Sequence, residues 1–167
     1  SMDFTPGIFN FTNKVLPDTH PQTTLAKQLA EYVLLYSPWQ MAADIIENYE
    51  HQPAFSFVES VPTDWEKTVV VNAKIGNYIT IARKDKASDD WYVGSATDVD
   101  ARDLSIDLSF LDKDREYMAE IYSDGSGADY RSNPYPLMYQ RVKVTNASSL
   151  RLHLAPSGGA AVRINAL

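Results

Sequence analysis

The sequence contains no cysteine, and this absence excludes several kinds of chemistry. Without thiols the chain cannot form disulfides, bind zinc through thiolates or use a cysteine nucleophile. It also has no apolar run of the roughly 18 residues that a membrane-spanning helix needs. Residues 1–20 lack the charged and apolar regions of a signal peptide. The composition fits either the cytoplasm or a bacterial periplasm.

Basic residues are few, with 15 Lys and Arg against 22 Asp and Glu, for a net charge of -7. Because they form no cluster, we exclude nucleic acid and anionic membranes as partners. A chain of 167 residues can bury a core, but it is too short for a complete (β/α)8 barrel of about 250 residues. We expect one domain with an attached segment. Phe4, Ile8 and Phe9 look like core residues near the first residue, so we expect the natural protein to begin upstream.

The N-terminal part of the chain has the periodicity of helices. Apolar residues recur every three or four positions over residues 24–36, which predicts an amphipathic helix capped by Thr23 or Thr24. Ser37-Pro38-Trp39-Gln40 has the form of a capping box with proline in the first turn, so we expect a second helix that continues through Tyr49. Residues 53–60 fit either a strand or a short helix, and we favour the helix.

After Trp65 the apolar residues alternate with polar ones, which predicts β-strands. The segments with this period of two are residues 68–73, 78–83, 91–96, 104–108, 117–122, 138–144, 150–154 and 161–164. Turn residues separate most of them, and Asp124-Gly125-Ser126-Gly127 is one predicted turn. Because no helix lies between these strands, they must pair mainly antiparallel. The predicted fold class is mainly β with N-terminal helices (α+β), with an antiparallel β-sandwich of about eight strands.

The polar residues do not form a recognisable catalytic or metal site in the sequence. Most acidic residues fall in predicted turns or helix ends, where solvated carboxylates are common. Asp98, Asp100 and Asp103 resemble part of a calcium loop, but the central glycine and closing glutamate of an EF-hand are missing. The three histidines are far apart and have no zinc spacing. Trp65 and Trp91 could stack on sugar rings, but we expect them to pack in the core.

Several short blocks, taken in order, carry a resemblance to a known family. They are Met2-Asp3-Phe4-Thr5-Pro6-Gly7-Ile8-Phe9, Thr24-Leu25-Ala26-Lys27-Gln28-Leu29-Ala30, Tyr36-Ser37-Pro38-Trp39-Gln40-Met41-Ala42-Ala43-Asp44, Val61-Pro62-Thr63-Asp64-Trp65, Gly76-Asn77-Tyr78-Ile79, Ala82-Arg83, Trp91-Tyr92-Val93-Gly94, Leu108-Ser109-Phe110-Leu111 and Gly158-Gly159-Ala160-Ala161. Together they resemble the C-terminal part of glycoside hydrolase family 97, the bacterial α-glucosidases and α-galactosidases of Bacteroidetes starch utilisation. The resemblance runs through nearly the whole chain.

This resemblance implies a division into two parts. Residues 1–61 would be the last β/α unit of a (β/α)8 catalytic barrel, and residues 62–167 a C-terminal β-sandwich that supports the barrel and does no chemistry itself. The resemblance also implies that the catalytic carboxylates and the calcium-binding glutamates of the parent lie upstream. We therefore expect no catalytic residue, no metal site and no bound calcium in this chain, which alone would be inactive. The family implies a periplasmic location and an oligo- or polysaccharide substrate.

One local inference concerns the first residues. If Met2 to Ile8 is the last barrel strand with its loop, the end of that strand faces the active site. Asp3 and Thr5 are then the substrate-proximal candidates.

Two other roles stay open. The sandwich could be a carbohydrate-binding module that grips glycan with exposed aromatic residues, or a structural and assembly module. The helix faces around Leu29, Val33 and Ile46 would lose their cover without the barrel. We expect them either to fold against the sandwich or to drive self-association.

Overall fold

The computed structural model describes residues 4–12, 14–16 and 19–167. In this part of the chain, three helices precede eight strands, as the sequence predicted. The elements are α1 (Leu25–Leu34), α2 (Ile46–Tyr49), α3 (Phe55–Ser60), β1 (Trp65–Lys74), β2 (Tyr78–Asp85), β3 (Trp91–Thr97), β4 (Arg102–Asp107), β5 (Tyr117–Asp124), β6 (Leu137–Val144), β7 (Ser149–Leu154) and β8 (Gly159–Ala166).

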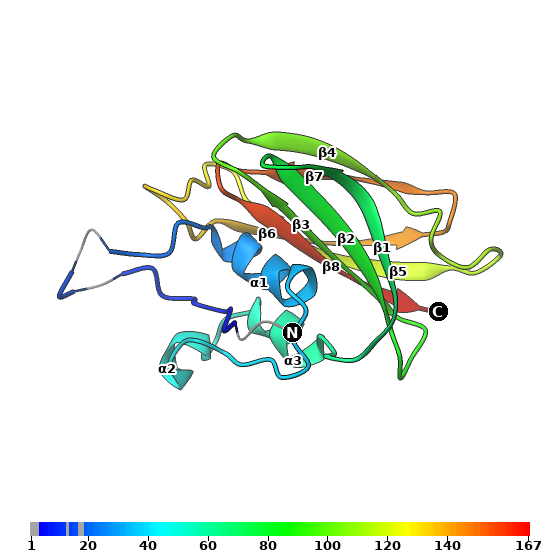
Figure 1. The fold of residues 1–167 in the computed structure, drawn as a ribbon, viewed down its shortest axis with the longest axis horizontal. Coiled ribbons are helices and arrows are strands. Elements are labelled where there is room, and N and C mark those ends of the chain that lie inside the picture. The colour runs from blue at the N-terminus through cyan, green and yellow to red at the C-terminus, as the bar shows by residue number, and fades with distance from the viewer. Residues whose placement is uncertain (1–3, 13, 17–18) are drawn as a thin grey trace.

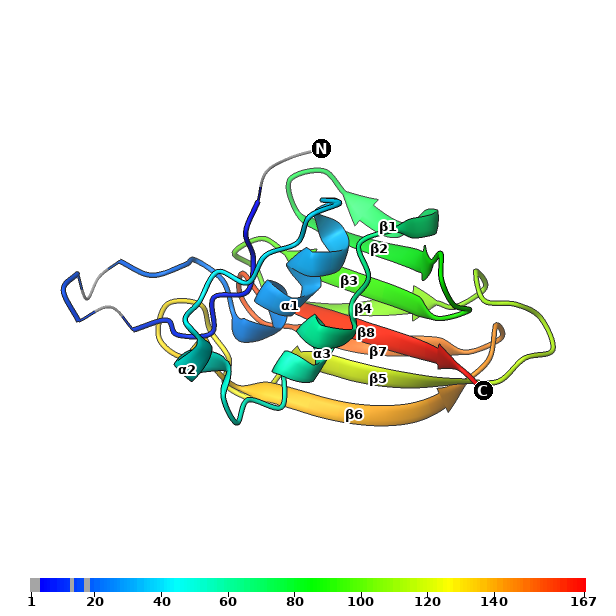
Figure 2. The ribbon, with the colours of Figure 1, turned by 90° about the horizontal axis from the view of Figure 1, so that it is seen from below.

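The strands form two antiparallel sheets of unequal size. The large sheet has the order β1-β2-β3-β8-β5-β6, and the small sheet pairs β4 with β7. Figures 1 and 2 show the small sheet over one face of the large sheet and the helices over the other face. The predicted fold class, an antiparallel β-sandwich of eight strands with N-terminal helices, is confirmed.

Two hydrophobic cores separate these layers. The core between the sheets is built on alternate residues such as Val93, Ile106 and Leu152, and it includes Trp91, which is 2% exposed. The core under the helices contains Phe57 and Tyr92 among others. Trp91 therefore packs in the core as expected and offers no ring to a sugar.

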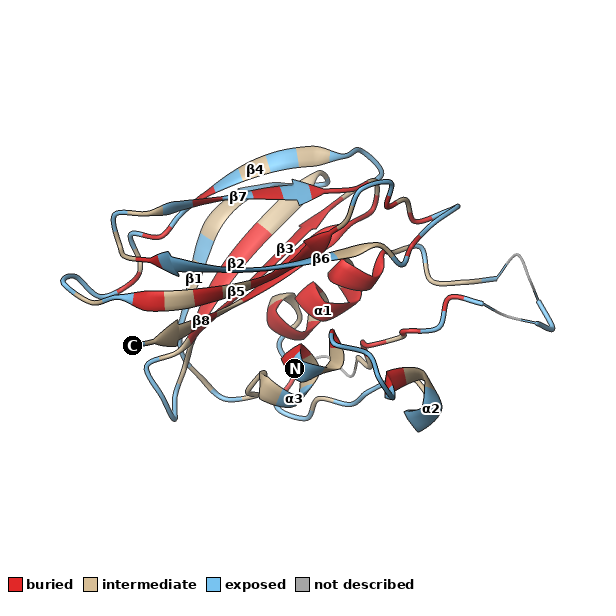
Figure 3. Ribbon diagram, turned by 180° about the vertical axis from the view of Figure 1, so that it is seen from behind, coloured by how far each residue is buried: buried red, intermediate tan, exposed pale blue. Residues whose placement is uncertain are grey.

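Helix α1 lies directly on the large sheet and is buried on nearly all sides (Figure 3). Thr24 caps it by accepting a hydrogen bond from the amide of Lys27. Gly94 of β3 permits the close approach, because a Cβ atom there would collide with the carbonyl oxygen of Ala30. Leu29 and Val33 are completely buried, so this helix face folds against the sandwich, which is one of the two outcomes expected from the sequence.

The second predicted helix is wrong over residues 37–44, which are irregular, and only Ile46–Tyr49 is helical. The Ser37 hydroxyl binds the amide and carbonyl of Trp39 instead of capping a helix through Gln40. The Gln40 side chain donates to the carbonyls of Tyr32 and Leu35 at the end of α1. The expected capping residues therefore close the first helix rather than open a second one.

The first described residues also differ from the expectation of a strand. Residues 4–8 are not a β-strand in this structure. A strand needs a neighbour to accept its backbone hydrogen bonds, and here those of Gly7 and Ile8 go to side chains. No helix in the described part of the chain is long and apolar enough to cross a membrane.

Candidate functional site

The segment that precedes α1 is held to the helical layer by buried polar side chains. The Gln28 Oε1 atom accepts from the amides of Gly7 and Ile8, both at 2.9 Å. The Tyr49 hydroxyl donates to the Gly7 carbonyl at 2.7 Å, and the Tyr32 hydroxyl donates to the Pro6 carbonyl at 3.2 Å. Irregular backbone thus obtains its partners from α1 and α2, which fixes its course across the molecule.

Asp44 holds the continuation of this segment. Its Oδ2 atom accepts from the amides of Phe9 and Asn10 at 2.9 and 2.7 Å. Partial burial opposes ionisation, but hydrogen bonds from Asn48 and from these amides outweigh it and hold the pKa of Asp44 below its ordinary value. Asp44 is therefore an ionised residue that holds backbone in place. Both of its carboxylate oxygens accept hydrogen bonds from this chain.

The two substrate-proximal candidates fall at the start of this segment. Asp3 lies outside the described residues. Thr5 is half-buried and directly precedes Pro6, whose carbonyl also accepts from the amide of Ala43 at 3.0 Å. The Pro6 carbonyl accepts from Tyr32 of α1, so Thr5 directly precedes a residue held by the helical layer. Whether Asp3 or Thr5 approaches a substrate stays a prediction.

A buried carboxylate at the end of β5 joins this strand to the connection between β7 and β8. Asp124, predicted to lie in a turn, is 1% exposed. Its Oδ2 atom accepts from the amides of Ala155 and Gly159 at 2.8 and 2.9 Å, in the connection from β7 to β8. Burial raises the pKa of Asp124, and these hydrogen bonds act against the rise. No saccharide can reach this carboxylate, so its role is structural.

Lys27 and Glu31 lie on the same side of α1. Lys27 Nζ donates to the Thr97 carbonyl at 3.0 Å and to Ser157 Oγ at 3.3 Å, which ties α1 to the sheet. Burial raises the pKa of Glu31 to about 7, and the Lys27 ammonium partly counteracts this rise. The buried Oε2 atom of Glu31 receives no hydrogen bond from the described residues. This acid is therefore poised to change its protonation near neutral pH.

The acidic residues considered for calcium are bound to other side chains. Asp98 forms an ion pair with Arg102 and accepts a hydrogen bond from Asn77, and Asp103 pairs with His153 at 2.8 Å. Among the described residues, no group of three or more histidine or acidic side chains could hold a metal ion. The residues present here do not fit a calcium site.

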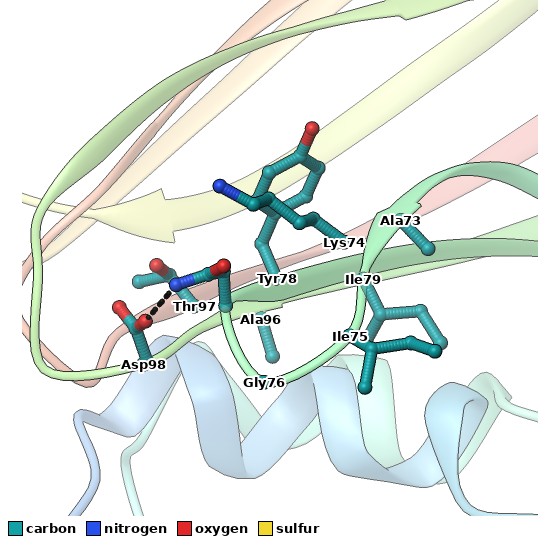
Figure 4. Close-up of a pocket in the computed structure, with 10 residues that line it drawn as sticks. Ala73, Lys74, Ile75, Gly76, Tyr78, Ile79, Ala96, Thr97 and Asp98 are labelled. Atoms are coloured by element: carbon teal, nitrogen blue, oxygen red, sulfur yellow. Dashed lines mark hydrogen bonds between the residues drawn. The ribbon is translucent and has the colours of Figure 1, made fainter.

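A shallow hollow of about 400 Å³ lies at the turn between β1 and β2, and Figure 4 shows the residues that line it. Ile75 and Ile79 point to the same side as Ala96, whereas Lys74 and Tyr78 point the other way. The hydrogen bond from Asn77 to Asp98 closes one edge. With an apolar floor and no pair of facing carboxylates, this hollow is not arranged for glycoside hydrolysis.

Sequence reasoning missed the three side chains that organise this region: Gln28, Asp44 and Asp124. Only Gln28 carried a usable signal, because it lies one turn after Leu25 on the apolar face of a predicted helix. A polar residue at such a position is buried and needs partners. Asp44 and Asp124 bind backbone 34 and 31 or more positions away, which no local pattern encodes.

Residues 64–165 match the family model described as "Glycosyl-hydrolase 97 C-terminal, oligomerisation". The retaining alpha-galactosidase of Bacteroides thetaiotaomicron is 36% identical over 174 residues, which cover 98% of this chain and 25% of that protein.

Solved structures agree. A glycoside hydrolase family 97 enzyme from Pseudoalteromonas sp. strain K8, determined in complexes with panose and with acarbose, superimposes with a TM-score of 0.93 at 46% identity and covers 99% of this chain and 26% of that chain. A beta-arabinopyranosidase superimposes with a TM-score of 0.78 at 27% identity and covers 98% and 25%. This chain therefore spans about a quarter of the length of these relatives. The resemblance inferred from the sequence is confirmed, and the chain belongs to glycoside hydrolase family 97, with residues 64–165 as its C-terminal domain.

Proposed function

We propose that this chain is the C-terminal part of a longer glycoside hydrolase that cleaves α-galactosides or α-glucosides, in which it supports the catalytic barrel and contributes no catalytic residue. The relatives, about four times longer, include a retaining alpha-galactosidase and an enzyme determined with panose and acarbose. The buried position of Asp124 and the pairing of Asp98 with Arg102 and of Asp103 with His153 support a scaffold role, because each carboxylate already binds groups of this chain.

One observation carries the proposal, namely a run of exposed apolar side chains between the end of α1 and the start of α2. We call it the connector patch, and it consists of Tyr36, Trp39, Met41, Ile45 and Ile46. Trp39 and Ile46 are 78% and 76% exposed, although such residues are normally covered. Exposed apolar patches mark contact surfaces. The catalytic barrel is the proposed cover, since the helical layer belongs to the part of the chain that precedes the C-terminal domain.

In this arrangement residues 1–61 complete the barrel and residues 62–167 form the supporting sandwich. Residues 4–8 would become the last barrel strand once a neighbouring strand replaces Gln28 as the partner of the Gly7 and Ile8 amides. Asp3 and Thr5 would then lie at the substrate end of that strand. Calcium, if the whole enzyme uses it, would be held by residues other than those described here. The proposed location of the whole enzyme is the periplasm, where it would act on oligo- or polysaccharides.

The test compares this chain with the full-length protein. We expect hydrolysis of an aryl α-galactoside or aryl α-glucoside by the full-length protein alone, with loss of activity after calcium chelation. Turnover by the 167-residue chain would contradict a scaffold role. A second comparison uses Trp39→Asp, which should destabilise the full-length protein but leave this chain unaffected. Val99→Asp, at a residue that is 61% exposed in the sandwich, is the matched control and should change neither.

Self-association is a second role, favoured by the word "oligomerisation" in the description of the family model that matches residues 64–165. The matched residues exclude the connector patch. The proposed contact between copies therefore lies on the sandwich, whereas the connector patch is reserved for the barrel.

A further inference from the structure

The outer face of the small sheet is poorly suited to a contact between two copies of the chain. The outer face of the small sheet is polar, and its exposed residues are Asp103, Ser105, Asp107, Ser149, Arg151 and His153. Asp103 and His153 are already engaged with each other, with 2.8 Å between Oδ1 and Nδ1. This face offers little apolar area to a partner. Its polar side chains would lose their hydration in a contact, which costs free energy, so we expect the face to stay in water.

The two edges of the large sheet are also unlike each other. Strand β1 has register shifts between Trp65 and Lys67 and between Val70 and Asn72. Bulges of this kind twist an edge away from regular pairing, and the exposed Glu66 and Lys67 add charge to it. The β1 edge is therefore protected against addition of another strand.

Strand β6 lacks the register shifts of β1, although it also carries the exposed Arg141 and Lys143. It pairs with β5 in unbroken register over all eight residues from Leu137 to Val144, and it contains no proline. Its side chains are exposed along most of the strand (Figure 3), including Met138 at 39%, Tyr139 at 49% and Val142 at 40%. The small sheet leaves Val142 uncovered although it stands opposite the buried Ala119. A regular, half-apolar edge is a template for another strand.

The charges on β6 do not oppose such pairing. Arg141 Nε lies 3.3 Å from Glu120 Oε1, and Lys143 Nζ lies 3.9 Å from Glu116 Oε2. Both acids belong to β5 or directly precede it. Two copies of β6 that meet would therefore each bring locally balanced charge, despite the net charge of -7 on the chain.

We infer that β6 is the contact through which two copies of this chain associate, by antiparallel pairing of β6 with β6 of a second copy across a two-fold axis. This inference rests on the proposed self-association and assigns it a surface. In a two-fold contact the same strand serves both partners, and an antiparallel pair satisfies this symmetry. The large sheets of the two copies then form one continuous sheet, with Met138, Tyr139 and Val142 packed beside the partner strand.

The test measures association of the full 167-residue chain by sedimentation velocity over a concentration series. We expect a monomer–dimer equilibrium and an association constant at least about tenfold lower for Val142→Lys, because the new ammonium has no acidic partner like those of Arg141 and Lys143 and would have to be desolvated in the contact. Tyr139→Lys, on the opposite face of β6, should give the same loss. Val70→Lys places the same substitution on the β1 edge at a residue that is 58% exposed, and it should change nothing.

Two further measurements separate the outcomes. Unchanged thermal unfolding of the β6 variants would attribute weaker association to the surface itself, and slower amide exchange in β6 at high concentration would support the pairing. A wild-type chain that stays monomeric, or a dimer broken by Ile46→Lys but not by Val142→Lys, would overturn the inference. Neither result would affect the supporting role, which is tested by activity and by Trp39→Asp in the full-length protein.

Discussion

Gly158 and Asp124 occupy adjoining space so closely that a Cβ atom on Gly158 would overlap the Asp124 Oδ2 atom. The same oxygen accepts the amides of Ala155 and Gly159. Because Gly158 has no side chain, the Asp124 carboxylate fits beside it. Through this carboxylate, β5 holds the connection that leads into β8.

Gly158→Ala should destabilise the chain by about 1–3 kcal/mol or more, because the new methyl group must displace a buried carboxylate or the backbone around it. Urea unfolding followed by circular dichroism measures the change. Ser126→Ala, at an exposed turn position after the same strand, is the control and should have little effect. Equal stability of both variants would mean that Asp124 can move without cost.

Glu31→Gln should alter how stability depends on pH. In the folded chain the pKa of Glu31 is about 7, above the ordinary value of 4.5. Between these values the folded state holds more protons than the unfolded state, so the free energy of unfolding falls as pH rises from 4.5 through about 7. The difference between these two pKa values corresponds to a fall of about 3 kcal/mol in the free energy of unfolding. Glutamine does not ionise, so the free energy of unfolding of the variant does not fall in this way. The variant should therefore be more stable than the wild type at pH 8.

Chemical unfolding at several pH values measures this effect. Glu47→Gln, on the exposed side of α2, is the matched control and should keep the pH dependence of the wild type. If Glu31→Gln follows the wild-type curve, then Glu31 is solvated or paired at neutral pH.

Phe57→Ala should cost about 3–5 kcal/mol, the usual effect of removing a buried aromatic ring. Phe57 is 1% exposed and packs edge-to-face on Tyr92 and Tyr122 of the large sheet, at 6.1 and 5.6 Å between ring centroids. Glu59→Ala, on the exposed side of α3, is the control.

The same experiment examines the boundary placed at residues 61 and 62. Because Phe57 belongs to the part before it but packs on the sheet after it, we expect one cooperative transition in calorimetry. Two transitions, with only the weaker one shifted by Phe57→Ala, would show that the helices unfold independently.

Trp91→Ala and Trp65→Ala test whether aromatic residues of the sandwich bind glycan. Trp91 is buried against Phe110, so its loss should lower stability by about 3–5 kcal/mol. Trp65 packs on Tyr92 and is only half-buried, so a smaller loss is expected. Glycan affinity lost without a loss of stability would instead favour a carbohydrate-binding module.

Local periodicity was sufficient for the strands and for α1. Alternation such as Leu150, Leu152 and Leu154 places one face of a strand in the core, and β7 follows it at every position. It failed at residues 37–44, because Ser37 and Gln40 found partners closer than those of a new helix.

The candidate site was less accessible to sequence reasoning. Asp124 follows an alternating strand and precedes two glycines of a turn, so its sequence neighbours favour an exposed position. What buries it is the β7–β8 connection, which folds over it from 31 residues away. The resemblance to a family supplied the parent enzyme, whereas the contacts that hold this chain together became visible only in three dimensions.

The position of β8 has a consequence for synthesis on the ribosome. Although β8 is the last of the eight strands in chain order, it lies in the middle of the large sheet, between β3 and β5. The β1–β3 meander and the β5–β6 hairpin are made earlier but cannot join until Gly159–Ala166 is inserted between them. Nascent chains therefore carry two half-sheets with open edges until β8 has been made, and open edges of this kind favour aggregation.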